Sequence, residues 1–160
     1  RRQREEWLQN PPRGIEVILA DFSITAGVEA LLAELGRRAI RLRTLIHNAS
    51  LWLPDDAGAD GFQQMFMVHM QAPFLLNSAS DRLFAEGVTG DIIHISDHVA
   101  QRGSRRHAAY SASKAGLEAL SLSFAARLAP QIKVNTIAPA LIMFNPADWV
   151  RLMIAAFDAQ

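Results

Sequence analysis

Tyr110 and Lys114 are the pair of residues whose types and spacing most directly suggest chemistry, in the segment Tyr110-Ser111-Ala112-Ser113-Lys114. Residues four apart on a helix share one face, so the phenol and the ammonium group would be neighbours. A lysine there is expected to lower the tyrosine pKa from about 10 toward neutral pH. A tyrosine of that kind acts as a general acid or base. The alternative is an ordinary pair on a solvated helix face.

Short apolar runs alternate with helical patterns along the chain and would position this pair. Strands are predicted at residues 15–20, 42–46, 91–96 and 132–137. A first helix is predicted to start at a cap residue, Ser23 or Thr25, and to stop near Gly36. Two longer helices are predicted over residues 59–85 and 108–128. The alternation predicts an α/β fold with a doubly wound parallel sheet and helices on both faces. Ligands of such sheets bind beyond the carboxyl ends of the strands, here at Asp21, Asn48, Asp97 and the loop after Pro139.

Length and composition limit the classes of protein that this chain can represent. Its 160 residues, half of them hydrophobic, can bury a core and are expected to form one domain over residues 1–160. Sixteen basic residues balance sixteen acidic ones, so no net charge indicates nucleic acid or a membrane as partner. The absence of cysteine excludes disulfides and thiolate sites and fits a cytoplasmic protein. The histidines show no zinc-ligand spacing, so no metal is expected.

Four motifs in this order resemble the short-chain dehydrogenase/reductase family. They are Asp21-Phe22 after a strand, His47-Asn48-Ala49-Ser50, Tyr110 with Lys114, and Asn135-Thr136-Ile137-Ala138-Pro139-Ala140. The resemblance covers most of the chain and implies a Rossmann-like fold and an NADPH-dependent oxidoreductase. It implies Tyr110 and Lys114 as catalytic residues. The cofactor-binding residues that it implies are Arg1, Asp21, Phe22, Asn48, Ala49, Ser50, Ser96, Tyr110, Lys114, Pro139 and Ile142.

Asp97 departs from the family pattern, because a serine usually stands thirteen residues before the tyrosine. A serine hydroxyl can donate to a ketone oxygen, whereas an ionised carboxylate would repel the alkoxide that develops there. A carboxylate suits a substrate with N–H donors or a ring nitrogen that receives a proton. Aspartate at this place resembles the pteridine-reductase branch, and in particular the bacterial dihydromonapterin reductases. The alternative is a turn or cap aspartate, with Ser96 supplying the hydroxyl.

The resemblance implies transfer of hydride from NADPH to the C6=N5 bond of a dihydropterin such as dihydromonapterin, with dihydrofolate as a further substrate. Tyr110 would donate or relay the proton, Lys114 would hold the nicotinamide ribose, and Asp97 would orient the substrate or pass a proton. The helices at residues 59–85 and 108–128 form the dimer faces of resembling enzymes, which implies a homotetramer. Two rivals stay open: a carbonyl or 3-oxoacyl reductase, and a catalytically silent binding or assembly member.

Three further residues are candidates for the site, and the first two have two readings each. His69 stands where the family has an asparagine that helps to hold a water, and it would replace that asparagine or be a locally satisfied helix histidine. Arg1 would bind a 2′-phosphate or belong to a solvated terminus. Trp52 would line the pterin pocket.

No glycine-rich phosphate fingerprint occurs in the chain. We therefore expect the first βαβ unit and the C-terminal strand of the family to be missing from these 160 residues. A mobile loop is expected near residues 146–149, before a last helix from Trp149 to Phe157.

Overall fold

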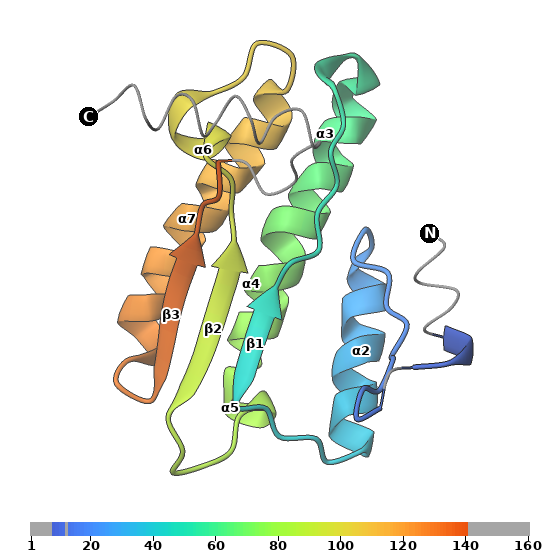
Figure 1. Ribbon diagram of the computed structural model, residues 1–160, viewed down its shortest axis with the longest axis vertical. Helices are drawn as coiled ribbons and strands as arrows, with labels where there is room; N and C mark the ends of the chain where they lie inside the picture. Colours follow the sequence, from blue (N-terminus) through green and yellow to red (C-terminus); the bar gives the residue numbers. More distant parts are fainter. Residues whose placement is uncertain (1–7, 12, 141–160) are drawn as a thin grey trace, which may run out of the picture.

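A three-stranded parallel sheet is the centre of the fold in a computed structural model that describes residues 8–11 and 13–140 (Figure 1). The strands are β1 (Thr44–His47), β2 (Gly90–Ile95) and β3 (Ile132–Ile137), in the order β1-β2-β3. Thr44 pairs with Asp91, and Gly90 pairs with Ile132. The parallel α/β sheet that the sequence predicts is therefore confirmed, and its three carboxyl ends meet at one edge.

The helices account for most of the remaining described residues. They are α2 (Thr25–Arg37), α3 (Gly58–Phe66), α4 (Ala72–Ser78), α5 (Ser80–Leu83), α6 (Val99–Arg102) and α7 (Ala108–Leu128). A short 3-10 turn, η1 (Asp55–Ala57), precedes α3, and a π-helical turn, η2 (Met67–Gln71), joins α3 to α4. The long helix predicted over residues 59–85 is thus one helical rod whose winding changes at η2 and which breaks at Ala79. Proline at the start of α4 is compatible with a helix because its missing N–H is tolerated there.

The core lies between the sheet and the rod formed by α3, η2 and α4, together with α7. Alternate residues of each strand point into it, as in Ile92 and His94 of β2, which are both 0% exposed. The main apolar cluster consists of Ala79, Leu83, Phe84, Ile92, Phe124, Ile132 and Val134. Gly116 lets α7 approach η2 closely, because a Cβ there would lie 2.6 Å from the sulfur of Met70. Close contact between α7 and η2 brings His69 near the first turns of α7.

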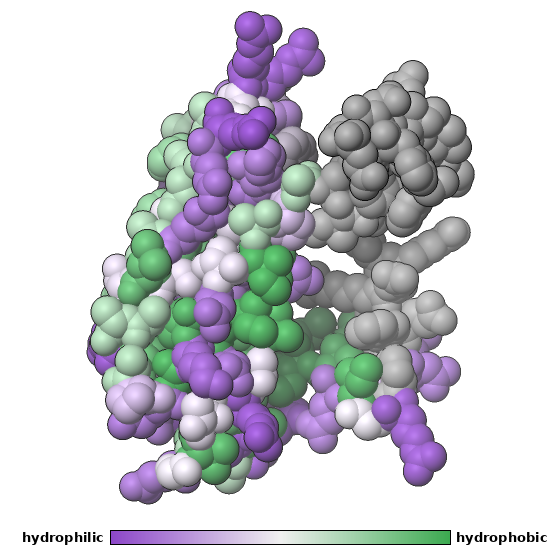
Figure 2. Space-filling model, turned by 60° about the vertical axis from the view of Figure 1, so that its left-hand side comes forward, coloured by the Kyte–Doolittle hydropathy of each residue, from purple (hydrophilic) through white to green (hydrophobic). Residues whose placement is uncertain are grey.

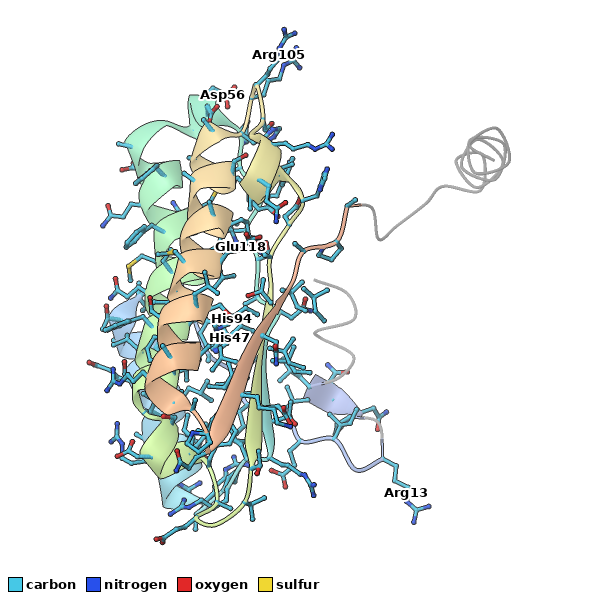
Figure 3. The ribbon with its side chains drawn as sticks, turned by 90° about the vertical axis from the view of Figure 1, so that its left-hand side faces the viewer. Arg13, His47, Asp56, His94, Arg105 and Glu118 are labelled. Carbon is cyan, nitrogen blue, oxygen red and sulfur yellow. The ribbon has the colours of Figure 1, made fainter. Side chains whose placement is uncertain are left out.

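The described helices that cover the sheet do so from one face, which lies behind the sheet in Figure 1 and to its left in Figure 3. On the opposite face Ile46 is 57% exposed and Ile137 is 52% exposed. Of the two helical layers predicted from the sequence, the described residues therefore form one. Within residues 8–11 and 13–140, no helix is long and apolar enough to cross a membrane.

Two sequence predictions about the N-terminal third are wrong. Residues 15–20 do not form a strand, because no neighbouring strand of the described sheet supplies partners for their backbone. Neither Ser23 nor Thr25 caps α2, whose N-cap is Ile24. Ser23 instead donates its backbone N–H and its hydroxyl to the carboxylate of Asp21, at 2.9 and 2.6 Å. Arg1, Ile142, the segment 146–149 and the helix predicted from Trp149 lie outside the described residues.

Candidate active site

Tyr110 and Asp97 meet at the carboxyl end of the sheet. Tyr110 lies in the first turn of α7 and is 5% exposed. Its hydroxyl donates to Oδ2 of Asp97 at 3.0 Å, and Asp97 is the second residue after the end of β2. The other carboxylate oxygen, Oδ1, accepts the backbone N–H of Val99 at 3.0 Å. Asp97 therefore has the contact of a turn aspartate, which was one of the two alternatives from the sequence, and it also accepts from the tyrosine. Its predicted role toward a substrate stays a prediction.

Lys114 lies one helical turn after Tyr110 and is buried at 2% exposure. Its ammonium group donates to the backbone oxygen of Ile95 at 2.9 Å and lies 5.7 Å from the centre of the Tyr110 ring. Burial lowers the pKa of Lys114, and the charge of Asp97 opposes that shift. The predicted proximity of the phenol and the ammonium group is confirmed, with the lysine anchored on the end of β2.

The expected lowering of the Tyr110 pKa is wrong for this arrangement. The Tyr110 pKa is raised to about 12, first by burial and then by the hydrogen bond and the charge of Asp97. A hydrogen bond with the Ser50 side chain acts in the opposite direction. Burial penalises the phenolate, and a neighbouring carboxylate repels it. Tyr110 is thus held protonated at neutral pH, in the form that can give a proton away.

Ser96 does not supply a free hydroxyl beside the tyrosine. It is 4% exposed, and its hydroxyl donates to Oε1 of Glu118 on α7 at 2.8 Å. The backbone N–H of Ser96 donates to Ile137 at 2.8 Å and thereby ties the end of β2 to the end of β3. The neighbouring link, from the N–H of His98 to the oxygen of Pro139 at 3.0 Å, fixes the loop after β3 in the same way.

The residues predicted to line the adenosine side of the cofactor gather beside this site. Asp21, Phe22, Ala49 and Ser50 border one open hollow at the edge of the molecule. Asn48, next to them, is exposed at the carboxyl end of β1. These residues come from two segments that both leave the same end of the fold. Between residues 8 and 140, position 12 excepted, no three His, Asp or Glu side chains gather as they would around a metal ion.

His69 is buried in η2 at 1% exposure and connects the loop after β1 to α7. Its Nε2 accepts the backbone N–H of Leu51 at 3.0 Å and lies 3.0 Å from the hydroxyl of Ser50. Its Nδ1 lies 2.8 Å from the hydroxyl of Ser113, which donates to the backbone oxygen of Tyr110 at 2.7 Å. The histidine is therefore satisfied, but by partners 18 to 44 residues away in the sequence that belong to the site. Its replacement of the family's asparagine stays a prediction.

Trp52 covers the outer side of the tyrosine. Its ring centre lies 4.4 Å from that of Tyr110, edge on, and 4.1 Å from that of His107. Trp52 remains 53% exposed, so it presents an aromatic surface at the mouth of the site. This position fits the prediction that it lines a pocket for a planar ring.

Sequence reasoning missed two residues that hold the site together. Asp55, in η1, accepts the backbone N–H groups of Ala108 and Ala109 at 3.0 and 3.2 Å, and these hydrogen bonds lower the Asp55 pKa. It thereby caps α7 from another part of the chain, which no local capping pattern reveals. Ser113 carried a detectable signal: it lies three residues after Tyr110, on the buried face of α7, where a polar residue needs an explanation.

A family model described as enoyl-(acyl carrier protein) reductase, one of the short-chain dehydrogenase/reductase models, matches residues 3–153. Among the solved structures, the chain resembles FolM alternative dihydrofolate reductase 1 from Brucella canis complexed with NADP. Their identity is 29% and the TM-score is 0.72, over 85% of this chain and 56% of that one. A 4-hydroxyisoleucine dehydrogenase complexed with NADH gives 26% identity and a TM-score of 0.77, over 85% of this chain and 58% of that one.

Curated relatives agree with these likenesses. The dihydromonapterin reductases of Shigella flexneri and of Escherichia coli K12 are each 46% identical to the chain over 140 residues, which is 84% of this chain. The chain spans 58% of the length of these relatives. The matched residues include Asp97, Tyr110 and Lys114, whose side chains form the site described above. The chain therefore belongs to the short-chain dehydrogenase/reductase family.

Proposed function

We propose that the protein of which this chain is part reduces a dihydropterin with NADPH, with dihydromonapterin as substrate and dihydrofolate as a further one. The observation that carries the proposal is the 3.0 Å hydrogen bond from the Tyr110 hydroxyl to Asp97. It gives the tyrosine a carboxylate partner at the position where the family usually has serine. The 46% identity with dihydromonapterin reductases supports the same substrate class.

The carboxylate is the feature that favours a pterin over a ketone. A ketone becomes an alkoxide during reduction, and an anionic Asp97 would repel it. A pterin carries amino and ring N–H groups that donate to a carboxylate with the strength of a charge-assisted hydrogen bond. Ser96 is already bonded to Glu118, so it does not replace the serine that a ketone reductase needs.

The chain offers residues that fit the cofactor. Asp21, Phe22, Ala49 and Ser50 border the hollow on the adenosine side, and the ammonium group of Lys114 stands beside the Tyr110 ring at the other end of the site. NADPH, when bound, supplies a hydride. In our proposal Asp21 holds the adenosine, and Lys114 holds the nicotinamide ribose. Arg1 and Ile142 remain predictions as cofactor contacts, because they lie outside the described residues.

Reduction of the C6=N5 bond adds a hydride to the carbon and a proton to the nitrogen, so that the π bond is replaced by one C–H and one N–H bond. Tyr110, held protonated by its raised pKa, supplies the proton. Asp97 already accepts the Tyr110 hydroxyl, and it orients the substrate through its N–H groups. Lys114 stabilises the negative charge left on the phenolate, as a nearby cation does.

The test measures the oxidation of NADPH by the full-length protein. Dihydromonapterin, dihydrofolate and a simple ketone are offered as substrates in parallel assays. We expect the wild-type protein to turn over the pterin. The rate of pterin reduction should fall by about a hundredfold or more in Tyr110→Phe and by a comparable factor in Asp97→Ala. Turnover of the ketone alone would refute the pterin proposal and favour the carbonyl reductase, which Asp97→Ser should then preserve or improve. Failure to bind NADPH at all would favour the silent family member.

We further propose that the protein is a cytoplasmic homotetramer. Two helical surfaces support this assembly, because Phe62 on α3 is 52% exposed and Leu122 on α7 is 75% exposed. Exposed apolar groups of this size on adjacent helices are typical of surfaces that another subunit covers.

A further inference from the structure

Glu118 is a partly buried carboxylate of α7 whose presence is not explained by charge pairing. Within residues 8–11 and 13–140, no basic side chain forms an ion pair with it. Figure 3 shows it between α7 and the sheet. Its Oε1 accepts the hydroxyl of Ser96 at 2.8 Å. Taking a carboxylate out of water without a cation is costly, so this polar pair indicates a role beyond packing.

Glu118 is the third of a row of polar residues on α7. Tyr110, Lys114 and Glu118 follow one another at intervals of four, so they lie near one face of the helix. Lys114 donates to the backbone oxygen of Ile95 at 2.9 Å. Tyr110 donates to the carboxylate of Asp97 at 3.0 Å. Glu118 binds the one residue that lies between Ile95 and Asp97 in the chain, so the row holds three consecutive residues at the end of β2.

Ser96 is held from two sides by hydrogen bonds. Its backbone N–H donates to the oxygen of Ile137 in β3 at 2.8 Å. Its hydroxyl has one hydrogen, which is directed to Glu118 because the backbone oxygen of Lys114 is uncharged and lies farther away, at 3.4 Å. The first bond fixes Ser96 within the sheet, and the second fixes it on α7. Together they determine where the chain enters Asp97.

The Asp97 carboxylate depends on this anchor for its place beside the tyrosine. Its Oδ1 accepts the backbone N–H of Val99, which belongs to the same loop and moves with it. Its Oδ2 accepts from Tyr110, which belongs to α7. The distance between Oδ2 and the phenol hydroxyl therefore depends on how firmly the loop is held on α7. Near a reacting group, a displacement of about 1 Å can lower a rate about a hundredfold.

We propose that Glu118 is a positioning residue, which through Ser96 holds the Asp97 carboxylate against Tyr110 in the geometry that the reaction uses. This inference rests on the proposed function, in which Asp97 orients the substrate and Tyr110 gives the proton. Glu118 acts through its hydrogen bond with Ser96 and not through its charge. A neutral side chain that accepts the same hydrogen bond should therefore serve as well.

Three substitutions separate the hydrogen bond from the charge, and a fourth is the control. Glu118→Gln keeps an oxygen that accepts from Ser96 and removes the charge. Glu118→Ala removes the acceptor, and Ser96→Ala removes the donor from the other side with a smaller loss of volume. Glu29→Ala, the same change at an exposed position of α2, is the control. A direct effect of the charge would appear equally in Glu118→Gln and Glu118→Ala.

The first measurement uses no substrate and so is independent of the proposed function. Carbon-labelled tyrosine gives a ring signal of Tyr110, identified by its loss in Tyr110→Phe. The pH titration of this signal reports the contact with Asp97, because that contact raises the Tyr110 pKa. Glu118→Ala and Ser96→Ala should ionise Tyr110 at lower pH than the parent protein does. Glu118→Gln and Glu29→Ala should leave the titration in place.

The same titration in an Asp97→Asn background tests whether the effect passes through Asp97. Glu118→Ala should cause no further shift there, because the charged partner of Tyr110 is already absent. Equal titrations of the parent protein and Glu118→Ala would overturn the proposal. So would an equal shift in Glu118→Gln, or a shift that persists in the Asp97→Asn background.

The second measurement is the steady-state kinetics of pterin reduction by the full-length protein. Glu118→Ala should lower kcat about tenfold, less than a full displacement of about 1 Å would cost, and should leave the KM for NADPH unchanged. Ser96→Ala should lower kcat to a similar extent, and Glu118→Gln should retain the parent value. Added to Asp97→Ala, Glu118→Ala should cause no further loss, since residues that act through one group are not additive.

A parent kcat in Glu118→Ala, or a full further loss on top of Asp97→Ala, would overturn the positioning role of Glu118. Absence of pterin turnover in the parent protein would instead refute the proposed function. In that case the titration of Tyr110 would still decide whether Glu118 holds Asp97 in place.

Discussion

Tyr110 shows how one residue is governed by opposing neighbours. Burial and Asp97 raise its pKa to about 12, and Ser50 alone among the described residues acts against them through a side-chain hydrogen bond. Lys114, which the sequence predicted as the dominant influence, is bonded to the backbone of Ile95. The site in this form therefore stores a proton on Tyr110 rather than favouring the phenolate.

Asp97→Asn should lower the Tyr110 pKa while leaving it above the ordinary value of about 10. The substitution removes the charge and weakens the hydrogen bond that raise the pKa, but burial, the largest cause, remains. The measurement is the pH titration of the labelled Tyr110 ring carbon, and Asp56→Asn, at an exposed site before α3, is the matched control. If Asp97→Asn left the titration unchanged, Asp97 would not control the protonation of Tyr110.

At the scale of elements, the sequence predicts most accurately the helices and strands that bury one face, because the spacing of their apolar residues follows that face. The helix at residues 108–128 and the strand at residues 132–137 have the predicted bounds, and β2 differs from its prediction by one residue. Residues 15–20 have the same apolar pattern but form no strand, because strand structure requires a partner that a local pattern cannot supply.

The candidate site was predictable to a similar extent. The Tyr110, Lys114 and Asp97 constellation follows from motif spacing along two neighbouring elements. The contacts of His69 were not predictable, because they depend on the π-helical turn η2 and on contacts up to 44 residues apart in the sequence. The direction of the Tyr110 pKa shift depends on burial, which is a property of tertiary packing and not of spacing.

Two histidines on neighbouring strands face the helical layer and share one asparagine. His47 and His94 lie side by side (Figure 3), with ring centres 4.9 Å apart. Nε2 of His47 lies 2.8 Å from Oδ1 of Asn77, and Nδ2 of Asn77 lies 3.0 Å from Nε2 of His94. The amide thus accepts from one imidazole and donates to the other, which requires His94 to carry its proton on Nδ1. Burial lowers the pKa of His47 to about 4 and that of His94 to about 3, so both are neutral in the folded protein.

These histidines should make the fold sensitive to acid. Their folded pKa values lie below the unfolded value of about 6.5, so the unfolded chain binds more protons as the pH falls below that value. Stability is therefore fully present above about pH 6.5 and decreases by up to about 1.4 kcal/mol per pH unit for each histidine, until the folded pKa is reached. Urea unfolding at several pH values measures this slope.

His94→Leu serves as the test variant, because it removes one of the three histidines whose pKa is lowered by burial, His47, His69 and His94, and it puts an apolar side chain in the core position. Its unfolding free energy should depend less steeply on pH between about pH 6.5 and about pH 4 than that of the parent protein. His98, which follows Asp97 in the loop after β2, provides the control substitution His98→Leu. A parent protein whose stability is level over this range would show that the two buried histidines do not couple folding to pH.

At the scale of the whole molecule, hydrophilic and apolar side chains are unevenly distributed over the surface of the described structure. Hydrophilic side chains gather at the end that carries Arg105, whereas apolar patches occur along the side where α7 and β3 come forward (Figures 2 and 3). The rod of α3 and α4 runs beside α7, and the Phe74 ring of the rod lies 5.9 Å from that of Phe124. Phe62, Phe66 and Phe74 along the rod and Leu122 on α7 are each at least 44% exposed.

In the proposed assembly a second copy of the chain covers this surface, because a two-fold axis places the same apolar helices of both copies against each other. Leu122→Glu should therefore reduce the mass of the full-length protein in solution, since a buried unpaired carboxylate is costly at the centre of an interface. Light scattering after gel filtration measures the mass. Val88→Glu, at a 48% exposed position in the turn before β2, introduces the same charge outside α3, α4 and α7 and should leave the mass unchanged. A monomeric parent, or equal masses for the parent and Leu122→Glu, would exclude these helices as the assembly surface, and the exposed phenylalanines would then need another partner.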